Sequence, residues 1–259
     1  MQRVRFEGGS APGTAFVTGA GSGIGQASAV RLHQLGYRLG LFDRDADALD
    51  KTAALLRDGA ESVCVVGDVT SPEDLREAVD TTRERVGTIG ACAACAGIEV
   101  LGPFTETTAD QWSKVMAVNL MGVVNTAQAV LADLQASRGA FVAISSDAGT
   151  QGFAQWTAYC ASKHAVIGFI RAMADEFGPM GLRSNVVAPS MVETAMAERI
   201  FAEIGPDGMV ATTKSIPMAR LACAEEIAAV IVHLLSPEAS FTNGLVYAVD
   251  GGETSGIVG

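Results

Sequence analysis

Short apolar runs alternate with amphipathic stretches along the chain from residue 14 to about residue 249, without a low-complexity linker or a break in composition. Short runs of apolar and β-branched residues are typical of buried strands, whereas apolar positions that repeat every three or four residues predict helices. The predicted strands are residues 14–18, 38–43, 62–67, 90–95, 140–145, 182–188 and 245–249. Strands that alternate with helices predict an α/β fold in which a seven-stranded parallel sheet carries helices on both faces.

Two helix starts are marked by capping signals. Ser71 stands directly before Pro72, which fits the first turn of a helix, and Thr108 stands three residues before Gln111. The hydroxyl of serine or threonine at such a position can accept a backbone N–H of the first helical turn. We therefore expect helices to begin after Ser71 and after Thr108.

Two segments depart from this alternation. Residues 1–12 predict a flexible leader, which leaves residues 13–259 as a single domain. Residues 192–217 carry Gly205-Pro206-Asp207-Gly208 inside an otherwise helical pattern, which predicts two short helices joined by a turn. We interpret this segment as a lid, and an ordinary surface excursion is the alternative.

Composition narrows the class of protein. The chain has 259 residues and a formal charge of −11, which opposes a phosphate backbone, so nucleic acid is not expected as a partner. Its five cysteines are scattered, and no basic-then-apolar leader is present, which favours the cytoplasm. The apolar run around residues 227–235 is too short to span a membrane. His33, His164 and His233 lack clustered acids or cysteines, so no metal site is expected.

The first predicted strand runs into a glycine-rich segment, Thr18-Gly19-Ala20-Gly21-Ser22-Gly23-Ile24-Gly25. Glycines permit a sharp turn and let the backbone approach a pyrophosphate above the N-terminus of the next helix. The pattern G-x-G-x-x-G is not met because Ile24 would occupy its third glycine, but T-G-x-x-x-G-x-G fits every position. We interpret the segment as a dinucleotide-binding loop, with a simple turn as the alternative.

Asp43 ends the second predicted strand, eighteen residues beyond Gly25. A carboxylate there can accept hydrogen bonds from an adenosine ribose and would repel a 2′-phosphate. Arg44 could turn towards such a phosphate, but Ser22 leaves the glycine loop without a basic residue, so the pattern favours NAD over NADP. Asp68, which follows the third strand, is assigned to the adenine edge, with capping of the next helix as its alternative role.

Tyr159 and Lys163 stand four residues apart in Y-C-A-S-K, in a stretch without proline that reads as helix. At this spacing the phenol and the ammonium share one helix face, and Ser146 lies thirteen positions upstream at a strand end. Lowering a tyrosine pKa from about 10 towards 7 requires roughly 4 kcal/mol, which a partly desolvated lysine can supply. The three residues predict a proton-transfer unit, and a surface Tyr-Lys pair is the alternative.

The order of these motifs resembles the short-chain dehydrogenase/reductase family over essentially the whole chain. The resemblance rests on T-G-x-x-x-G-I-G, the asparagine of V-N-L at Asn119, the serine of I-S-S at Ser146, Tyr-x-x-x-Lys and a late loop that begins at Pro189. It implies a Rossmann-type doubly wound sheet that binds a nicotinamide cofactor.

The resemblance also implies a role for each catalytic residue. Tyr159 would act as acid and base on the substrate oxygen, Lys163 would lower the tyrosine pKa and bind the nicotinamide ribose, and Ser146 would hold the substrate oxygen. The spacing to tyrosine selects Ser146 over Ser145. Asn119 would kink its helix and hold a water between Lys163 and solvent, and a satisfied interior amide is the alternative.

Two places depart from the family pattern. Pro189-Ser190-Met191-Val192-Glu193-Thr194 resembles P-G-x-V-x-T, in which the threonine and the backbone meet the nicotinamide carboxamide; here Ser190 replaces glycine, a mild change unless φ is positive. Ala94-Cys95-Ala96-Gly97 replaces N-N-A-G, so Cys95 either weakens cofactor binding or fills the space of an asparagine. Cys92 and Cys95 form C-A-A-C, but this spacing on a strand turns them to opposite faces, so no redox dithiol is expected.

The expected site is assembled from several segments of the chain. The expected NAD-binding residues are Gly19, Gly21, Ser22, Gly23, Ile24, Gly25, Asp43, Arg44, Asp68, Val69, Cys95, Ala96, Gly97, Tyr159, Lys163, Pro189, Val192 and Thr194. The expected substrate-binding residues are Glu99, Ser146, Gln151, Phe153, Trp156, Met191 and Met196, with Ile200 and Phe201 as further candidates. This mostly apolar set favours a neutral, partly hydrophobic alcohol or ketone.

The predicted function is NAD(H)-dependent interconversion of a secondary alcohol and a ketone, with hydride transfer at nicotinamide C4. The alternatives are an NADPH-dependent 3-oxoacyl-thioester reductase and a non-catalytic NAD-binding sensor. Basic residues near the lid are sparse, Arg199 and Lys214 being the nearest, which disfavours a carrier-protein or coenzyme-A substrate. By resemblance, helices over 110–137 and 157–177 would form a four-helix interface in a homotetramer or homodimer.

Overall fold

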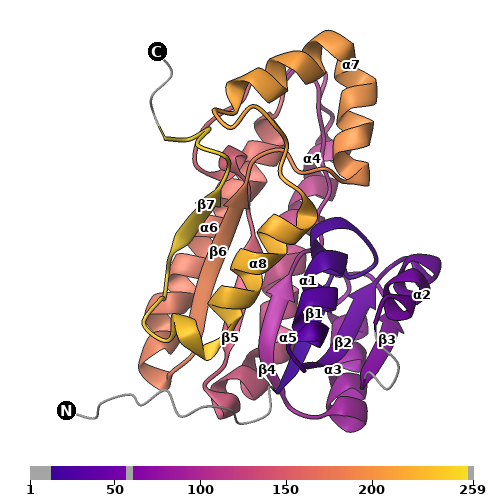
Figure 1. Cartoon of the computed structure of the whole chain (residues 1–259), viewed down its shortest axis with the longest axis vertical. Helices are drawn as coiled ribbons and strands as arrows, with labels where there is room; N and C mark the ends of the chain where they lie inside the picture. Colours follow the sequence, from indigo (N-terminus) through magenta and orange to yellow (C-terminus); the bar gives the residue numbers. More distant parts are fainter. Residues whose placement is uncertain (1–12, 57–60, 256–259) are drawn as a thin grey trace.

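A seven-stranded sheet lies at the centre of the computed structural model, which describes residues 13–56 and 61–255 (Figure 1). All strands are parallel, and their order is β3-β2-β1-β4-β5-β6-β7. The strands are β1 (Thr14–Thr18), β2 (Arg38–Asp43), β3 (Ser62–Val66), β4 (Ile89–Ala94), β5 (Ala140–Ile144), β6 (Arg183–Pro189) and β7 (Val246–Val249). The predicted sheet is confirmed, and each predicted strand end lies within one residue of the observed end. The predicted leader, 1–12, lies outside the described residues.

Helices form the connections between the strands. They are α1 (Gly23–Gln34), α2 (Ala46–Ala54), α3 (Pro72–Val86), α4 (Ala109–Met116), α5 (Gly122–Ser137), α6 (Thr157–Phe177), α7 (Ala195–Ser215) and α8 (Ala224–Leu235). A π-helical turn, η1 (Ala117–Met121), joins α4 to α5, and short 3-10 turns are η2 (Asp147–Gly149), η3 (Gly178–Met180) and η4 (Pro237–Ala239). Both predicted caps are present: Ser71 Oγ accepts the N–H of Asp74, and Thr108 with Gln111 forms a reciprocal capping box.

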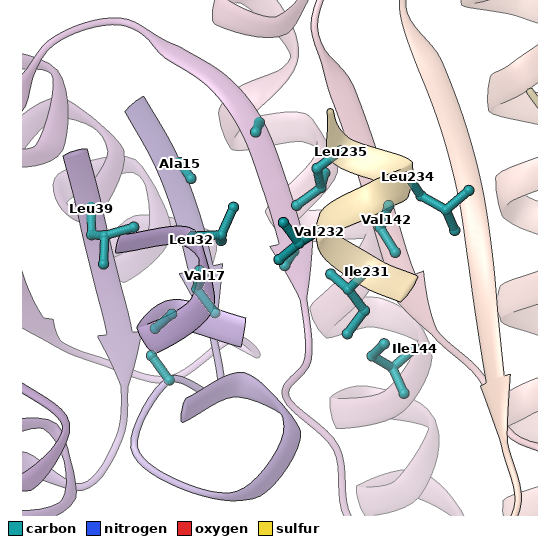
Figure 2. Packing of buried hydrophobic residues seen from close by; sticks show 14 of the residues in the cluster. Ala15, Val17, Leu32, Leu39, Val142, Ile144, Ile231, Val232, Leu234 and Leu235 are labelled. Carbon is teal, nitrogen blue, oxygen red and sulfur yellow. The ribbon is translucent and has the colours of Figure 1, made fainter. Parts of the chain in front are cut away.

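The buried strands supply two hydrophobic cores, one on each face of the sheet, because successive side chains of a strand point in opposite directions. Ala15 and Val17 of β1 enter the core shared with α1 and α8, whereas Phe16 enters the core shared with α3, α5 and α6. Figure 2 shows Ile231 and Val232 of α8 beside strand β5 in the first core. Strands buried on both faces explain why the sequence reads there as continuous apolar runs.

The strand order reverses between β1 and β4. From β1 the chain builds outwards through β2 and β3, and it then returns to the other side of β1 to place β4 and the remaining strands. The loops that leave β1 and β4 therefore diverge and open a crevice at the carboxyl ends of these strands, which is where ligands bind in open α/β sheets. The N–H of Cys95 donates to the Thr18 carbonyl at 3.2 Å and joins the two strand ends beside this crevice.

The helical run Ala109–Ser137 is long and apolar enough to cross a membrane by length and composition. This run is longer than the one around residues 227–235, which was the longest apolar run expected from the sequence. In the folded chain the α5 part lies against β4, and Val123, Val130 and Leu134 are buried in the core beneath the sheet. A core helix of this kind passes the same test, so the run by itself assigns no membrane location.

Helix α7 has the two-part form that the sequence predicts. The helix is interrupted at Gly205, which has a φ of 73°, a conformation that glycine adopts readily, and Pro206 follows. Figure 1 shows α7 (orange) beyond the end of the sheet, apart from the helices that cover its faces. The role of a lid stays a prediction.

Candidate active site

The glycine loop is packed so closely that side chains would not fit at its key positions. A Cβ built on Gly25 would lie 2.0 Å from the Gly19 carbonyl oxygen, and one on Gly19, whose φ is 67°, would lie 2.7 Å from the Ala96 nitrogen. The first turn of α1 contains no acidic residue, and the side chain of Ser22 makes no capping hydrogen bond. No carboxylate within the first turn thus balances the positive end of the α1 dipole, which suits an anionic pyrophosphate.

Asp43 is fixed at the rim of the glycine loop. Its Oδ2 accepts the N–H of Gly21 at 2.9 Å, and its Oδ1 accepts the N–H of Asp45 at 3.1 Å. The side chain of Arg44 is exposed and forms no part of this arrangement. The Asp43 carboxylate is therefore the charged group that would face an adenosine ribose bound beside this loop.

Asp68 organises the turn before α3 but does not cap the helix. Its Oδ1 accepts both the N–H and the hydroxyl of Thr70 at 2.8 Å, while Ser71 provides the cap. The capping role that the sequence analysis kept as an alternative is therefore wrong in that form. Val69 is buried next to it, and its carbonyl accepts the side-chain amide of Asn125 at 3.0 Å.

Ser146, Tyr159 and Lys163 come together in one cavity although they lie on different elements. Ser146 follows β5 and caps η2, whereas Tyr159 and Lys163 lie on one face of α6. The Tyr159 hydroxyl is hydrogen-bonded to Ser146, and the Lys163 Nζ lies 5.5 Å from the centre of the tyrosine ring. The Trp156 ring stands edge-on to the Tyr159 ring at 5.4 Å.

The protonation of this group differs from the sequence expectation. Burial raises the pKa of Tyr159 above its ordinary value, the hydrogen bond with Ser146 lowers it, and the negative charges of Asp147 and Glu99 raise it. The net shift is opposite to the lowering assigned to Lys163. The physical reason is the burial of the Tyr159 phenol itself. Lys163 is buried as well: burial lowers its pKa to about 8, and its Nζ donates to the Ile144 carbonyl at 3.0 Å.

Asn119 lies in the π-helical turn η1 and is fully buried. Its Oδ1 accepts the N–H of Ile98 at 2.8 Å, and its Nδ2 donates to the Ile98 carbonyl at 2.9 Å and to Ser162 Oγ at 3.1 Å. A Cβ built on Gly97 would lie 3.5 Å from both Asn119 Oδ1 and Lys163 Nζ. The amide is thus satisfied inside the protein and fixes the loop after β4 close to Lys163; the water stays a prediction.

The late loop closes onto the glycine loop. Pro189 ends β6, Thr194 caps α7, and a Cβ built on Gly23 would lie 3.1 Å from the Thr194 methyl group. Val192 forms an isolated parallel bridge with Ala222. Ser190 is not among the described residues other than glycine that have a positive φ, so its replacement of glycine causes no backbone strain.

Cys95 acts as a packed thiol. Its side chain lies against the core on the α1 and α8 face, whereas Cys92 is buried in the opposite core, which confirms that the two thiols point to opposite faces. Burial raises the pKa of Cys95 to about 12, with the Lys163 charge acting in the other direction. The thiol is therefore protonated at neutral pH, and whether it weakens cofactor binding or replaces the asparagine by volume stays a prediction.

The cavity that contains these residues has a volume of about 450 Å³. Its wall includes the expected residues Phe153, Trp156, Met191, Met196 and Ile200, whereas Glu99, Gln151 and Phe201 lie outside the lining. Glu99 instead pairs with Arg199 of α7, with Oε1 2.8 Å from Nε.

Part of the cavity wall is formed by residues that were not expected from the sequence. These residues include Asp147, Ile204, Ala211, Thr212, Ser215 and Glu253. Asp147 could have been found because it directly follows Ser146. No neighbouring motif indicates Glu253, which reaches the cavity from the turn after β7 near the end of the chain.

Comparison with known proteins places the chain among oxidoreductases. The family model described as Enoyl-(Acyl carrier protein) reductase matches residues 19–254. Levodione reductase of Leifsonia aquatica is 34% identical over 261 residues, covering 95% of this chain and 98% of that protein. Meso-2,3-butanediol dehydrogenase of Serratia marcescens is 36% identical over 241 residues, covering 92% and 93%. The crystal structure of levodione reductase superposes with a TM-score of 0.92 at 33% identity, covering 96% of this chain and 99% of that one.

Proposed function

The chain belongs to the short-chain dehydrogenase/reductase family, and on that premise we propose that it interconverts a secondary alcohol and a ketone with NAD(H) as cofactor. Relatives named as a ketone reductase and as alcohol dehydrogenases support oxidoreduction of small alcohols and ketones. The observation that carries the proposal is the meeting of Ser146, Tyr159 and Lys163 in one largely apolar cavity next to the glycine loop.

In the proposed mechanism the residues of the chain position the substrate oxygen and move its proton. Ser146 and the Tyr159 hydroxyl bind that oxygen from adjacent elements, and Tyr159 passes the proton to it or takes the proton from it. Lys163, with a pKa of about 8, can exchange a proton near neutral pH. The nicotinamide, when bound, accepts or supplies the hydride and in its oxidised form adds a positive charge that favours the phenolate.

The preference for NAD is proposed from Asp43. Its carboxylate accepts the Gly21 N–H at the rim of the loop, where it can also accept hydrogen bonds from ribose hydroxyls. A 2′-phosphate at the same place would meet like charge. The glycine loop and the start of α1 would hold the pyrophosphate, and Thr194 and the Pro189 segment would meet the nicotinamide side.

The decisive test is the variant Tyr159→Phe. We expect turnover of ketones with NADH to fall by about a hundredfold or more, because the proton donor is lost, while NADH binding persists. The matched control is Tyr247→Phe on β7, which removes a hydroxyl outside the cavity. Turnover in Tyr159→Phe comparable to that of the unmodified protein would exclude Tyr159 as the acid and base.

An NADPH-dependent 3-oxoacyl-thioester reductase is the second candidate, favoured by the family description and by the apolar cavity. Two observations weigh against it: Asp43 holds a carboxylate at the rim of the glycine loop, where it would repel a 2′-phosphate, and Arg199 near the cavity is already paired with Glu99. Dissociation constants for NADH and NADPH, measured together with turnover of a short 3-oxoacyl thioester, separate the two functions.

We also propose that the protein works in the cytoplasm as a homotetramer or homodimer. The outer face of α6 carries a stripe of small residues that the fold leaves uncovered at Ala161, Gly168 and Ala172, with Ala165 partly covered. No atom of the described residues outside α6 itself lies within 4 Å of a Cβ built on Gly168, so a second helix can approach closely there.

A further inference from the structure

The wall of the largely apolar cavity contains two carboxyl groups that the proposed mechanism does not use. Asp147 follows Ser146 in η2, and Glu253 comes from the turn after β7. Ser215, at the end of α7, lines the same part of the wall. Three segments distant in sequence thus place polar groups at one spot beside the reacting oxygen.

Hydrogen bonds within the protein fix both carboxyl groups. Asp147 Oδ1 accepts from Ser146 Oγ at 2.5 Å and from the N–H of Ala148 at 2.7 Å. Glu253 Oε1 accepts from Ser215 Oγ at 2.7 Å. The two carboxyl groups also interact directly with each other. Each carboxyl group is therefore fixed by hydrogen bonds from neighbouring residues, and both residues line the cavity.

The chemistry of such a pair suits a neutral polar group. Burial raises the pKa of Asp147 and that of Glu253, and the negative charge of Asp250 raises both. Asp147 raises the pKa of Glu253 further, whereas hydrogen bonding from Glu253 lowers the pKa of Asp147. Two adjacent carboxyl groups that share one proton present an O–H donor together with acceptor oxygens. A hydroxyl or carbonyl oxygen can form hydrogen bonds with such a pair. A cation would instead be bound best by two ionised carboxylates.

The position of the pair relative to Ser146 defines what it can reach. A substrate oxygen bound to Ser146 Oγ lies about 2.7 Å from it, and Asp147 Oδ1 lies 2.5 Å from the same atom. The reacting oxygen and Asp147 Oδ1 are thus separated by no more than about 5 Å. An oxygen on the carbon next to the reacting carbon falls within this distance.

We propose, resting on the function proposed above, that Asp147 and Glu253 recognise a second oxygen on the carbon adjacent to the reacting one, so that the substrates are vicinal diols and α-hydroxy ketones. The pair is a specificity device: it contacts the part of the substrate that does not react, while Ser146 and Tyr159 contact the part that does.

The test compares substrates that differ only in the second oxygen. With NADH, kcat/KM is measured for acetoin and for 2-butanone, and with NAD for 1,2-propanediol, 2-propanol and 1-amino-2-propanol. We expect acetoin to exceed 2-butanone by at least about tenfold, the equivalent of one well-made hydrogen bond. We expect the diol to exceed both the mono-alcohol and the amino alcohol.

Variants at Glu253 separate recognition from a structural effect. Glu253→Met should lower the acetoin to 2-butanone ratio about tenfold, because it removes the polar group at similar length. Glu253→Gln should restore most of the ratio, because an amide still offers a donor and an acceptor. The control Glu203→Met makes the same change on the exposed side of α7 and should leave the ratio as in the unmodified protein.

Three outcomes would overturn the inference alone, and a fourth would overturn it together with the proposed function. If Glu253→Met lowered kcat/KM equally for acetoin and 2-butanone, the two carboxyl groups would have only a structural role. If the unmodified protein turned over both ketones with equal kcat/KM, the second oxygen would not be recognised. A preference for the amino alcohol would mean that the pair binds a cation. Absence of turnover for every ketone and alcohol, with NADH still bound, would instead overturn the proposed function and the inference with it.

Discussion

Lys163 carries an ammonium group into the interior with one hydrogen bond, to the Ile144 carbonyl, and only 4% of the residue is exposed. Burial lowers its pKa from 10.5 to about 8 in the folded protein. Between these two values the unfolded chain binds the proton and the folded chain does not, so this residue makes the free energy of unfolding rise with pH from about 8 to about 10.5. Below pH 8 its full destabilising effect is present.

The variant Lys163→Met should therefore be inactive yet more stable at pH 7. The pKa difference corresponds to about 3 kcal/mol of relieved destabilisation, and loss of the hydrogen bond to Ile144 costs about 1 kcal/mol, which leaves a gain of about 2 kcal/mol. Urea unfolding at pH 7 and pH 10 measures this. The difference between variant and unmodified protein should shrink at pH 10, and a variant less stable at pH 7 would show that the ammonium stabilises the fold.

Asp43 sets the cofactor preference at the scale of one side chain. Asp43→Ala should lower the ratio of NADPH to NADH dissociation constants by about tenfold or more, because ribose hydrogen bonds and repulsion of a 2′-phosphate are lost together. Titration of both cofactors by fluorescence measures this ratio. The control is Asp45→Ala, which removes the cap of α2 and should lower stability but leave the ratio in place. An unchanged ratio in Asp43→Ala would show that residues other than Asp43 determine the preference between NADH and NADPH.

Among the elements, the π-helical turn η1 depends on Asn119. Replacing Asn119 by Ala leaves both the N–H and the carbonyl of Ile98 without their partner, which should lower the free energy of unfolding by about 2 kcal/mol or more. Asn125→Ala is the control, since that buried amide makes one hydrogen bond, to Val69, and its loss should cost less. Urea unfolding ranks the two, and equal losses would mean that the loop after β4 does not depend on η1.

Elements with local signals could be predicted from the sequence, and those created by packing could not. The caps at Ser71 and Thr108 and the break at Gly205 depend on neighbouring residues, so the sequence reveals them. The π-helical turn has no such mark, because it arises where Asn119 meets Ile98 and Ser162 across the fold.

The same distinction holds in the site. The spacing of Tyr159 and Lys163 fixed their shared helix face, but the direction of the Lys163 ammonium, towards Ile144, depends on how deeply α6 packs against β5. Burial, which controls the pKa of both residues, is a property of the assembled cavity. Glu253 reaches Asp147 only because β7 pairs with β6.

At the scale of the whole molecule, the uncovered stripe on α6 predicts self-association. Light scattering should give the mass of two or four chains, and Ala172→Arg should shift the protein to a smaller assembly, because a long charged side chain cannot fit between closely approaching helices. Circular dichroism of the variant checks that the chain stays folded. A single-chain mass for the unmodified protein would exclude this interface.

The reversal of strand order between β1 and β4 also constrains how the chain can fold. The glycine loop belongs to the first half of the sheet and the proton-transfer residues belong to the second, and they meet only after β4 has paired with β1 across two intervening strands of sequence. A pairing between segments so distant in sequence forms slowly. Because the site needs residues from both halves of the sheet, neither half alone could bind the cofactor. NADH should therefore recognise only the completed sheet, and its binding would shift the folding equilibrium of the entire chain.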